Sequence, residues 1–498
     1  MLEPIDIPPG VVRNGTQFQV GTRGRWYDAN LVRWIAGILA PVGGWTRRDT
    51  PAISGVCRDL FAWRDNSVNR WLAVGSNDGL FIADSGGAVL YDITPVGYVA
   101  GRVDAIRGFG YGYGAFGASS YGTARVSAGG KLLGAAGWSL DNWGEYLIAC
   151  APHDGRILEW QLDTATAAAV VANAPTDCKG AFVTPERHLV ALAANGNPRR
   201  VAWSDREDNT VWAPATTNLA GSYDLQTNGE IQVGVRARGQ TVILTTQDVY
   251  VMNWVGSPYV YGFDRISGTG GTGSPRSAVA FQGNIAWMAN DGFYVFDGLV
   301  KKLLSDVEDY VLSDINESQF SKVVGGHNRQ FSEIWWFYPS SASTEPDRYV
   351  IWNYREDHWS IGKLARTAFA SPGVLELPVL ASTDSYLYDH ETGWTDNGAA
   401  LGADRYAESG AVDIGSGERT LRATKLIPDE KTQGQTRVVF KTRFTPNGLE
   451  TQHGPYTLTD YTDVRFSGRQ IAVRIEGAAD ENWRVGIMRL EMQKAGER

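Results

Sequence analysis

Short stretches of aromatic and β-branched residues recur along the chain, each after a small turn and each with a Trp, Tyr or Phe near its centre. Seven copies occur, at residues 78–82, 155–160, 200–203, 248–251, 291–295, 349–352 and 385–388. From Arg156 onward they lie about 35 to 60 residues apart, close to the 40–50 residues of a four-stranded propeller blade. A unit this short cannot bury its own apolar face. The pattern therefore predicts blades that stack on their neighbours.

Two of these copies are parts of predicted hairpins. Residues 70–83 and 284–298 read as two apolar strands that flank the turns Asp78-Gly79 and Asp291-Gly292. An Asp-Gly pair can adopt the positive φ values that a tight turn needs. Residues 240–252 repeat the design with a less specific turn.

The two ends of the chain differ from this repeating region. Residues 1–50 predict an extended entry segment, in which a strand ends near Ile35 and turns at Ala36-Gly37. After residue 395, alternating strands are expected at 412–422, 435–443, 462–466 and 470–476, which fits a β-sandwich of roughly 100 residues. We therefore expect an all-β fold: an entry segment (1–50), a propeller of about six or seven blades (51–395) and a C-terminal β-sandwich-like domain (396–498).

One helix is predicted within the propeller region. Residues 305–312 are expected to form a short helix, because Ser305 followed by Glu308 has the spacing of a capping box. Ser305 would then be the residue that caps the helix N-terminus.

A glycine-aromatic stretch interrupts the repeats between the first and second predicted blades. Glycine alternates there with aromatic residues, which gives too flexible a backbone for a strand and too apolar a surface for a plain linker. We predict a projecting loop, inserted at about 101–128, that faces a channel or a neighbouring subunit. Its candidate interface residues are Phe109, Tyr111, Tyr113, Phe116 and Tyr121.

The net charge of the chain argues against a dedicated nucleic-acid-binding protein. The 498 residues carry a formal charge of −9, with a hydrophobic content of 43% and a mean hydropathy of −0.24. A dedicated nucleic-acid-binding protein normally has the opposite sign of charge. An acidic wall would repel a phosphate backbone, so DNA could pass such a surface without adhering to it.

Residues that usually carry chemistry are sparse. The odd number of cysteines, Cys57, Cys150 and Cys178, suggests buried thiols rather than a disulfide framework, and the six histidines form no metal-binding spacing. The first ten residues have no signal-peptide pattern, and no apolar run is long enough for a membrane span. We expect neither a metal nor an organic cofactor.

Three weak motifs are better explained by structural roles than by chemistry. Residues 204–212 loosely resemble the Asp-box of sialidases, but the aspartate spacing is wrong and the phrase occurs once. The Asp-Gly turns lack the ligand spacing of calcium loops. Residues 268–275 are glycine-rich but lack the Gly-Lys-Ser/Thr ending of a phosphate loop, which favours a mobile connection between strands.

Several phrases together resemble the tail nozzle or tail hub proteins of short-tailed bacteriophages, also called packaged-DNA stabilisation proteins. The phrases that carry this resemblance lie at 7–16, 24–34, 41–45, 200–205, 248–252, 255–259, 274–275, 467–470 and 482–486, together with Trp212 and Phe263. The resemblance spans nearly the whole chain.

The resemblance implies a structural virion protein without catalytic activity. Such a protein forms a ring, usually of six copies, below the portal and its adaptor in the tail of a virion assembled in the host cytoplasm. It would contact the adaptor, carry tail fibres or spikes, and hold genomic DNA that passes through the channel without sequence-specific binding.

Two other functions remain open. A glycan-binding or glycan-degrading propeller would need arginines or paired carboxylates at one mouth of the propeller. A fibre-type receptor-binding protein would be an elongated trimer with β-helical repeats.

Overall fold

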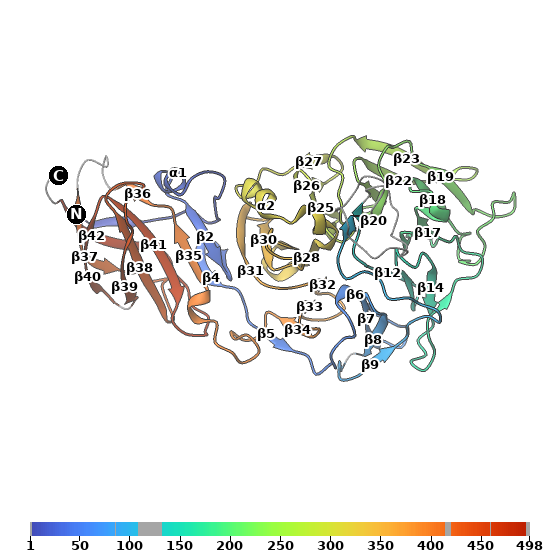
Figure 1. The fold of residues 1–498 in the computed structure, drawn as a ribbon, viewed down its shortest axis with the longest axis horizontal. Helices are drawn as coiled ribbons and strands as arrows, with labels where there is room; N and C mark the ends of the chain where they lie inside the picture. The colour runs from blue at the N-terminus through green and yellow to red at the C-terminus, as the bar shows by residue number, and fades with distance from the viewer. Residues whose placement is uncertain (1, 85, 108–131, 414–419, 459, 495–498) are drawn as a thin grey trace, which may run out of the picture.

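The computed structural model describes residues 2–84, 86–107, 132–413, 420–458 and 460–494. In these ranges the chain forms a wheel of seven four-stranded sheets beside a smaller unit of two packed sheets (Figure 1). Each sheet of the wheel is antiparallel, and six of the seven have their strands in chain order. This is a seven-bladed β-propeller, and the predicted all-β fold is confirmed.

The first four blades follow the chain from Cys57 to Ser267. Their strands are β6 (Cys57–Arg64), β7 (Arg70–Ser76), β8 (Leu80–Asp84) and β9 (Leu90–Asp92); β12 (Ser139–Trp143), β13 (Tyr146–Cys150), β14 (Ile157–Trp160) and β15 (Ala169–Val170); β16 (Gly180–Val183), β17 (Leu189–Leu192), β18 (Arg200–Trp203) and β19 (Gly221–Asp224); β20 (Ile231–Ala237), β21 (Gln240–Thr245), β22 (Val249–Gly256) and β23 (Val260–Ser267). The short helix η1 (Ala194–Gly196) lies in the third blade.

The last three blades consist of residues between Val279 and His390 together with one N-terminal strand, β5. Their strands are β24 (Val279–Phe281), β25 (Asn284–Ala289), β26 (Gly292–Phe296) and β27 (Val300–Lys302); β28 (Val324–Asn328), β29 (Glu333–Tyr338), β30 (Arg348–Asn353) and β31 (His358–Lys363); β32 (Ala368–Ala370), β33 (Val379–Ala381), β34 (Leu387–His390) and β5 (Trp45–Arg47). The helices α2 (Glu308–Asp314), η2 (Glu317–Lys322) and η3 (Arg329–Phe331) join or follow these strands.

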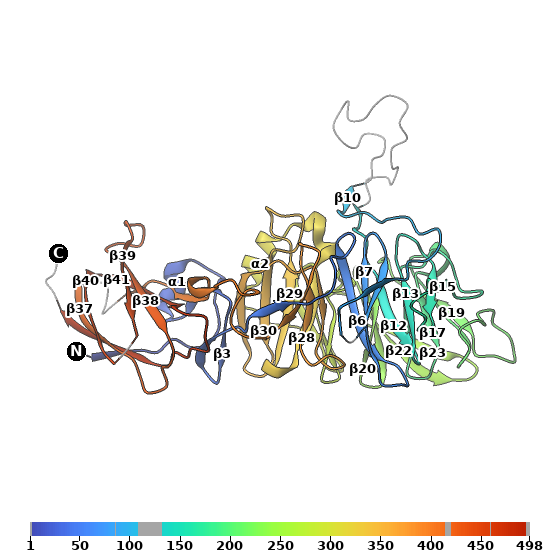
Figure 2. The same cartoon turned by 90° about the horizontal axis from the view of Figure 1, so that it is seen from below.

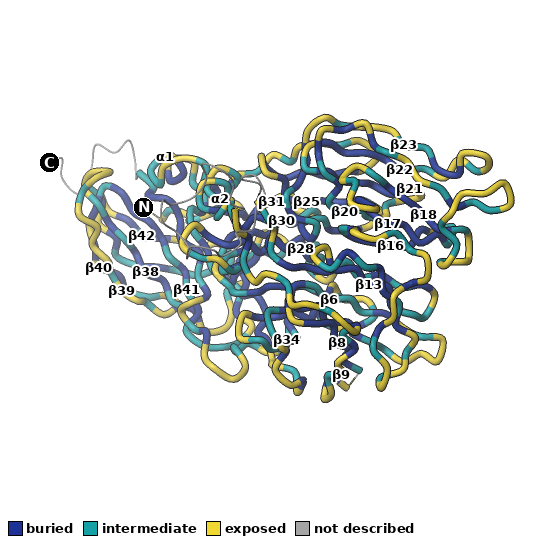
Figure 3. The backbone as a smooth tube through the Cα atoms, turned by 45° about the vertical axis from the view of Figure 1, so that its right-hand side comes forward, coloured by how far each residue is buried: buried dark blue, intermediate teal, exposed yellow. Residues whose placement is uncertain are grey.

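The seven recurrent phrases of the sequence all fall on the same position in a blade. Each covers all or part of the third strand: β8, β14, β18, β22, β26, β30 and β34. Most residues of these strands are buried, since both faces pack against neighbouring blades; the second half of β22 is the exception. Figure 3 shows this as buried strands joined by exposed loops. The repeat is thus a largely buried inner strand of each blade, which fits its apolar and aromatic content.

An N-terminal strand closes the wheel. β5 pairs antiparallel with β34, with Trp45 opposite His390 and Arg47 opposite Tyr388. The Trp45 and His390 rings stack with centroids 5.2 Å apart, and the guanidinium of Arg366 lies over Trp45 at 5.0 Å. The seventh blade therefore joins residues from both ends of the chain.

The smaller unit also combines both ends. One sheet has the order β1 (Leu2–Ile5), β42 (Met488–Lys494), β37 (Leu421–Ile427) and β40 (Thr462–Gly468). The other has the order β2 (Trp26–Asn30), β35 (Tyr406–Ser409), β41 (Gln470–Gly477), β38 (Thr436–Arg443) and β39 (Thr451–Thr457), with β36 (Val412–Asp413) paired to β41. The helices α1 (Gln17–Thr22) and η4 (Gly402–Asp404) flank it.

A continuous apolar core joins this unit to the wheel. The same cluster of buried residues includes Phe440 and Ile475 of the C-terminal sheets, Trp34 of the N-terminal hairpin, and Trp336 of the sixth blade. The hairpin of β3 (Val32–Ile35) and β4 (Ile38–Pro41) lies between the two units and contacts both (Figure 2).

A buried ion cluster fixes that hairpin. Arg33 donates from Nη1 and Nη2 to the carboxylate of Glu391 at 3.0 and 2.5 Å, and from Nη2 to Glu333 at 3.0 Å. The exposed fractions of these three side chains are only 2%, 7% and 2%. Because the side chains come from β3, β29 and the loop after β34, the cluster ties the hairpin to the sixth and seventh blades.

The predicted entry strand is broken in the structure. The turn at Ala36-Gly37 is confirmed, with φ values of 51° and 79°. The strand before it, however, divides at Leu31, where φ is 51°, so β2 pairs in the C-terminal unit and β3 pairs with β4. The backbone N–H of Leu31 donates to the Tyr349 hydroxyl at 2.7 Å, which holds this break against the sixth blade.

The predicted helix begins later than expected. α2 starts at Glu308, and Ser305 does not cap it; its hydroxyl accepts from the N–H of Val307 at 3.3 Å instead. The side-chain oxygen of Asn14 accepts from the N–H of Asp309 at 3.1 Å. A residue distant in sequence thus satisfies a helix donor that the local pattern had assigned to Ser305.

Candidate functional site

A cavity of about 1190 Å³ lies at the centre of the propeller. Its wall is formed mainly by the inner strands β6, β12, β16 and β20, together with Ala280 of β24. Residues 132–138 and the connection that carries α2 and η2 cover another side. The innermost strands of a propeller converge on its axis, so this space follows directly from the closure of the wheel.

Ion pairs cross the cavity wall from blade to blade. Arg236 on β20 donates from Nη2 to Asp141 on β12 at 2.7 Å, and Asp141 also accepts from the N–H of Val183 at 2.9 Å. Lys179 bonds Glu230 at 2.5 Å between the third and fourth blades. These pairs hold the second, third and fourth blades at a fixed distance around the cavity.

Asp59 on β6 is a carboxyl group on this wall whose protonation is altered by burial. Burial raises its pKa to about 7, although the positive charge of Arg276 acts in the opposite direction. Its Oδ1 accepts from the N–H of Leu60 at 2.9 Å. A carboxyl group with such a pKa can exist in both protonation states near neutral pH.

Arg276 connects the cavity to a polar network beside it. Its Nη1 donates to the carbonyl of Arg58 and its Nη2 to the carbonyl of Ser321, both at 2.7 Å. Its Nε has no hydrogen-bond partner although the side chain is only 9% exposed. Burial and the nearby charge of Arg58 lower the pKa of Arg276 to about 10.

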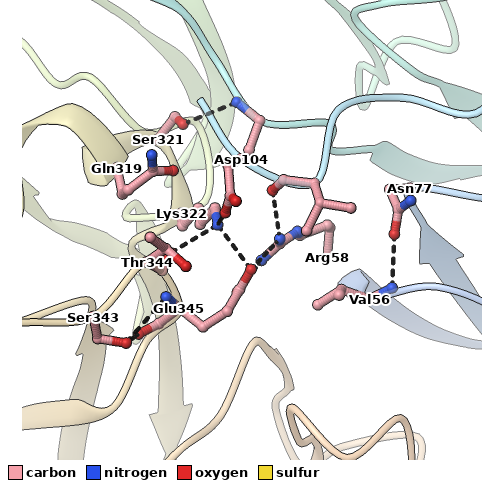
Figure 4. A network of polar contacts seen from close by, with 12 residues as sticks. Val56, Arg58, Asn77, Asp104, Gln319, Ser321, Lys322, Ser343, Thr344 and Glu345 are labelled. Carbon is pink, nitrogen blue, oxygen red and sulfur yellow. Dashed lines mark hydrogen bonds and ion pairs between the residues drawn. The ribbon is translucent and has the colours of Figure 1, made fainter. Parts of the chain in front are cut away.

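We call the adjacent network of Arg58, Asp104, Lys322 and Glu345 the clamp (Figure 4). Arg58 donates to both carboxylate oxygens of Glu345 at 2.6 Å. Lys322 donates to Glu345 at 2.7 Å, to Asp104 at 2.5 Å and to the carbonyl of Thr344 at 2.7 Å. Arg58 and Lys322 are 1% and 0% exposed. Each buried cation therefore has a buried or half-buried anion, as burial of charge requires.

The clamp adjoins the short hairpin of β10 (Ile106–Arg107) and β11 (Leu132–Leu133), which lies on one face of the wheel (Figure 2). Just before β10, the side-chain amide of Gln319 accepts from the N–H of Ala105 and donates to its carbonyl, both at 2.9 Å. Arg58 donates to the carbonyl of Val103 at 2.8 Å. The base of this hairpin is therefore bonded to the first blade and to η2.

The predicted interface residues Phe109, Tyr111, Tyr113, Phe116 and Tyr121 lie outside the described residues. The described hairpin β10–β11 flanks their segment. The clamp was not found from the sequence, because Arg58 and Glu345 are separated by 287 positions and belong to no motif.

The weak motifs have structural contacts. In the Asp-box-like segment, the carboxylate of Asp205 accepts from the N–H groups of Arg206 and Leu219 at 2.8 Å, and Trp212 donates to the carbonyl of Asn209 at 2.7 Å. The glycine-rich segment 268–275 is packed rather than loose, since Thr272 and Ser274 are fully buried and hydrogen-bonded. This packing contradicts the mobile connection expected there.

The cysteines are free and buried, as predicted. Burial raises the pKa of all three thiols, that of Cys178 to about 12. Among the described residues, no group of histidines, cysteines and carboxylates has metal-binding geometry. Within the described ranges, no helix has the length and apolar character needed to cross a bilayer.

No known family model and no curated protein matches the chain. Among solved structures, virginiamycin B lyase from Staphylococcus aureus aligns over 70% of this chain and 97% of its own, at 7% identity and a TM-score of 0.41. YCF48 from Cyanidioschyzon merolae aligns over 70% and 98%, at 8% identity and a TM-score of 0.41. The WD40 propeller of Doa1 aligns over 70% and 97%, at 12% identity and a TM-score of 0.42. These similarities concern the propeller architecture and carry no argument about function.

Proposed function

We propose that the chain is a structural protein of a virion tail, a nozzle or hub subunit that forms a ring below the portal and its adaptor. In this role it lengthens the tail tube, retains the packaged genome and provides attachment for fibres or spikes. The proposal rests on the sequence resemblance, whose phrases fall in the entry segment, the propeller and the C-terminal sheets.

The interleaving of the two chain ends is the structural observation that supports this role best. β1 pairs with β42, β2 pairs with β35, and β5 pairs with β34. The N-terminal segment thereby places two strands in the C-terminal unit and one in the propeller, and one continuous apolar core joins the two units. A part that bears load between a pressurised head and a host surface needs such a body, because a flexible linker would let its domains separate.

The net charge fits passage of DNA. With a formal charge of −9, a ring of several copies would carry a large negative charge. Acidic groups on a channel wall would repel phosphate and keep the genome from adhering during ejection.

The test is deletion of the gene from the phage or prophage that carries it, with complementation from a plasmid as the control. We expect heads that assemble but lose DNase-protected DNA, and rings on the complemented particles that a tag-specific antibody labels at the tail. Particles that lack the chain yet keep protected genomes and normal infectivity would reject the proposal. A monomer in isolation would decide nothing, because ring formation can require the adaptor.

A further inference from the structure

We propose that the central cavity of the propeller binds a small neutral saccharide of one to three residues. This inference stands on the cavity alone and does not depend on the tail function. Its volume of about 1190 Å³ exceeds the roughly 300–1,000 Å³ of ordinary ligand sites, so a short oligosaccharide fits.

The charges on the wall favour a neutral ligand. The described residues that line the cavity include four cations, Arg102, Lys179, Arg236 and Arg276, and four anions, Asp59, Asp141, Glu230 and Glu317. Arg236 with Asp141 and Lys179 with Glu230 already form ion pairs. A charged ligand would lose its hydration without finding a net counter-charge, whereas a neutral one avoids that cost.

The same wall offers hydrogen bonds of both kinds. Asp59 uses Oδ1 for the N–H of Leu60, and an ionised carboxylate has room for further donors. Asn228 and Asn290 are exposed amides on the cavity lining, and each can donate and accept. Sugar hydroxyls both donate and accept, so they match a wall where donors and acceptors alternate.

One aromatic side chain completes the site. Phe61 on β6 lines the cavity and is half-buried. Phe182 on β16 is only 5% exposed, because its ring packs on Gly234 of β20, and it supports the wall from behind. The C–H faces of a pyranose pack on aromatic rings, while its hydroxyl edges face the polar groups.

The experiment measures binding to the full chain by saturation-transfer NMR and calorimetry. The probes are glucose, galactose, mannose, N-acetylglucosamine, maltose and lactose, with glucose 6-phosphate as the charged comparison, each up to about 10 mM. We expect at least one neutral sugar to bind more tightly than the phosphate ester. Absence of binding by all neutral probes, or binding of the phosphate ester alone, would overturn the proposal.

Two cavity variants and one control locate the site. Asp59→Asn replaces one carboxylate acceptor by an amide donor with little change of volume, and Asn228→Ala removes an exposed amide. We expect each to weaken binding about tenfold or more, since a lost hydrogen-bond partner leaves a polar group of the ligand unpaired. Asp264→Asn, an exposed position on β23 outside the cavity lining, should leave binding unchanged. Wild-type affinity in both cavity variants would also reject the site.

Discussion

Arg58, on the inner strand of the first blade, and Glu345, on the loop between the second and third strands of the sixth, form a two-bond ion pair with both distances at 2.6 Å. The pair spans the wheel between blades that are not neighbours in the ring. Since Glu345 also accepts from Lys322 of η2, one carboxylate fixes the relative position of three segments. The segment that carries α2 and η2 beside the cavity is therefore fixed by ion pairs as well as by packing.

Replacement of Lys322 by methionine should destabilise the protein. The side chain is 0% exposed, and its removal leaves Asp104, Glu345 and the Thr344 carbonyl without their shared donor. We expect the free energy of unfolding in a denaturant titration to fall by about 3 kcal/mol. Lys301→Met, which breaks an exposed pair with Asp297, is the matched control and should cost about 0.5 kcal/mol or less. Equal effects of the two variants would contradict a special role of the clamp.

Loss of the Trp45 side chain should loosen the closing blade. Trp45 is 3% exposed, stacks on His390 and donates to Asp396, so Trp45→Ala creates a cavity and removes a hydrogen bond. We expect a loss of about 3–5 kcal/mol and faster proteolysis within residues 365–400. Thr46→Ala alters an exposed position on the same strand and should leave both measurements almost unchanged. Slow proteolysis in Trp45→Ala would show that closure does not depend on this residue.

Alanine at position 326 should strain the contact between the sixth and seventh blades. A Cβ on Gly326 would lie 2.1 Å from the ring of Phe369, and the backbone there needs no positive φ, so the effect is purely steric. We expect Gly326→Ala to cost about 1–3 kcal/mol, seen as a lower melting temperature. Gly373→Ala, whose new Cβ would meet nothing within 4 Å, is the control. If the strain is the cause, Phe369→Leu should recover part of the loss in the double variant.

The raised pKa of Asp59 makes stability depend on pH. The folded chain keeps the proton up to about pH 7, whereas the unfolded chain releases it at about pH 4. Between these values the folded state binds more protons, so this group lowers the free energy of unfolding as pH rises, and the lower value persists above pH 7.

Asp59→Asn removes this contribution. We measure the free energy of unfolding by denaturant titration at pH 4 and at pH 8. From the lower to the higher pH, the variant should gain about 1–4 kcal/mol of stability relative to the wild type. Asp264→Asn at an exposed site should run parallel to the wild type. If the difference in the free energy of unfolding between Asp59→Asn and the wild type is the same at both pH values, the carboxyl group of Asp59 titrates normally.

The third strands of the blades were predictable because each carries its own signal. A strand such as β26, with all five residues buried, must be apolar at every position, and its turn residues mark its start. The first strands are less visible: β16 is the four-residue stretch Gly-Ala-Phe-Val, and in β28 three of five residues are Gly, Gly and His. Their places depend on neighbouring blades, which no local pattern encodes.

The candidate site was less predictable than the fold. The cavity is lined by strands of five blades. Its polar residues are scattered along the sequence and belong to no recognisable motif, so the sequence does not predict them. Asn14 bonding to α2 and Arg33 bonding to Glu391 are contacts of the same kind, each made across most of the chain. The spacing of residues in the sequence predicts local contacts only. These contacts are long-range and form because the propeller ring closes, so the spacing could not predict them.

The pairing of β5 with β34 also imposes an order on synthesis. Residues 45–47 leave the ribosome before their partner strand, which ends at His390 and follows after more than three hundred further residues. Until then the nascent propeller is not closed between its first and last blades. Its apolar strand edges are exposed there, where they can bind chaperones or aggregate. A nascent chain stalled anywhere before that point cannot close its propeller, so the ring is completed only after His390 has been made.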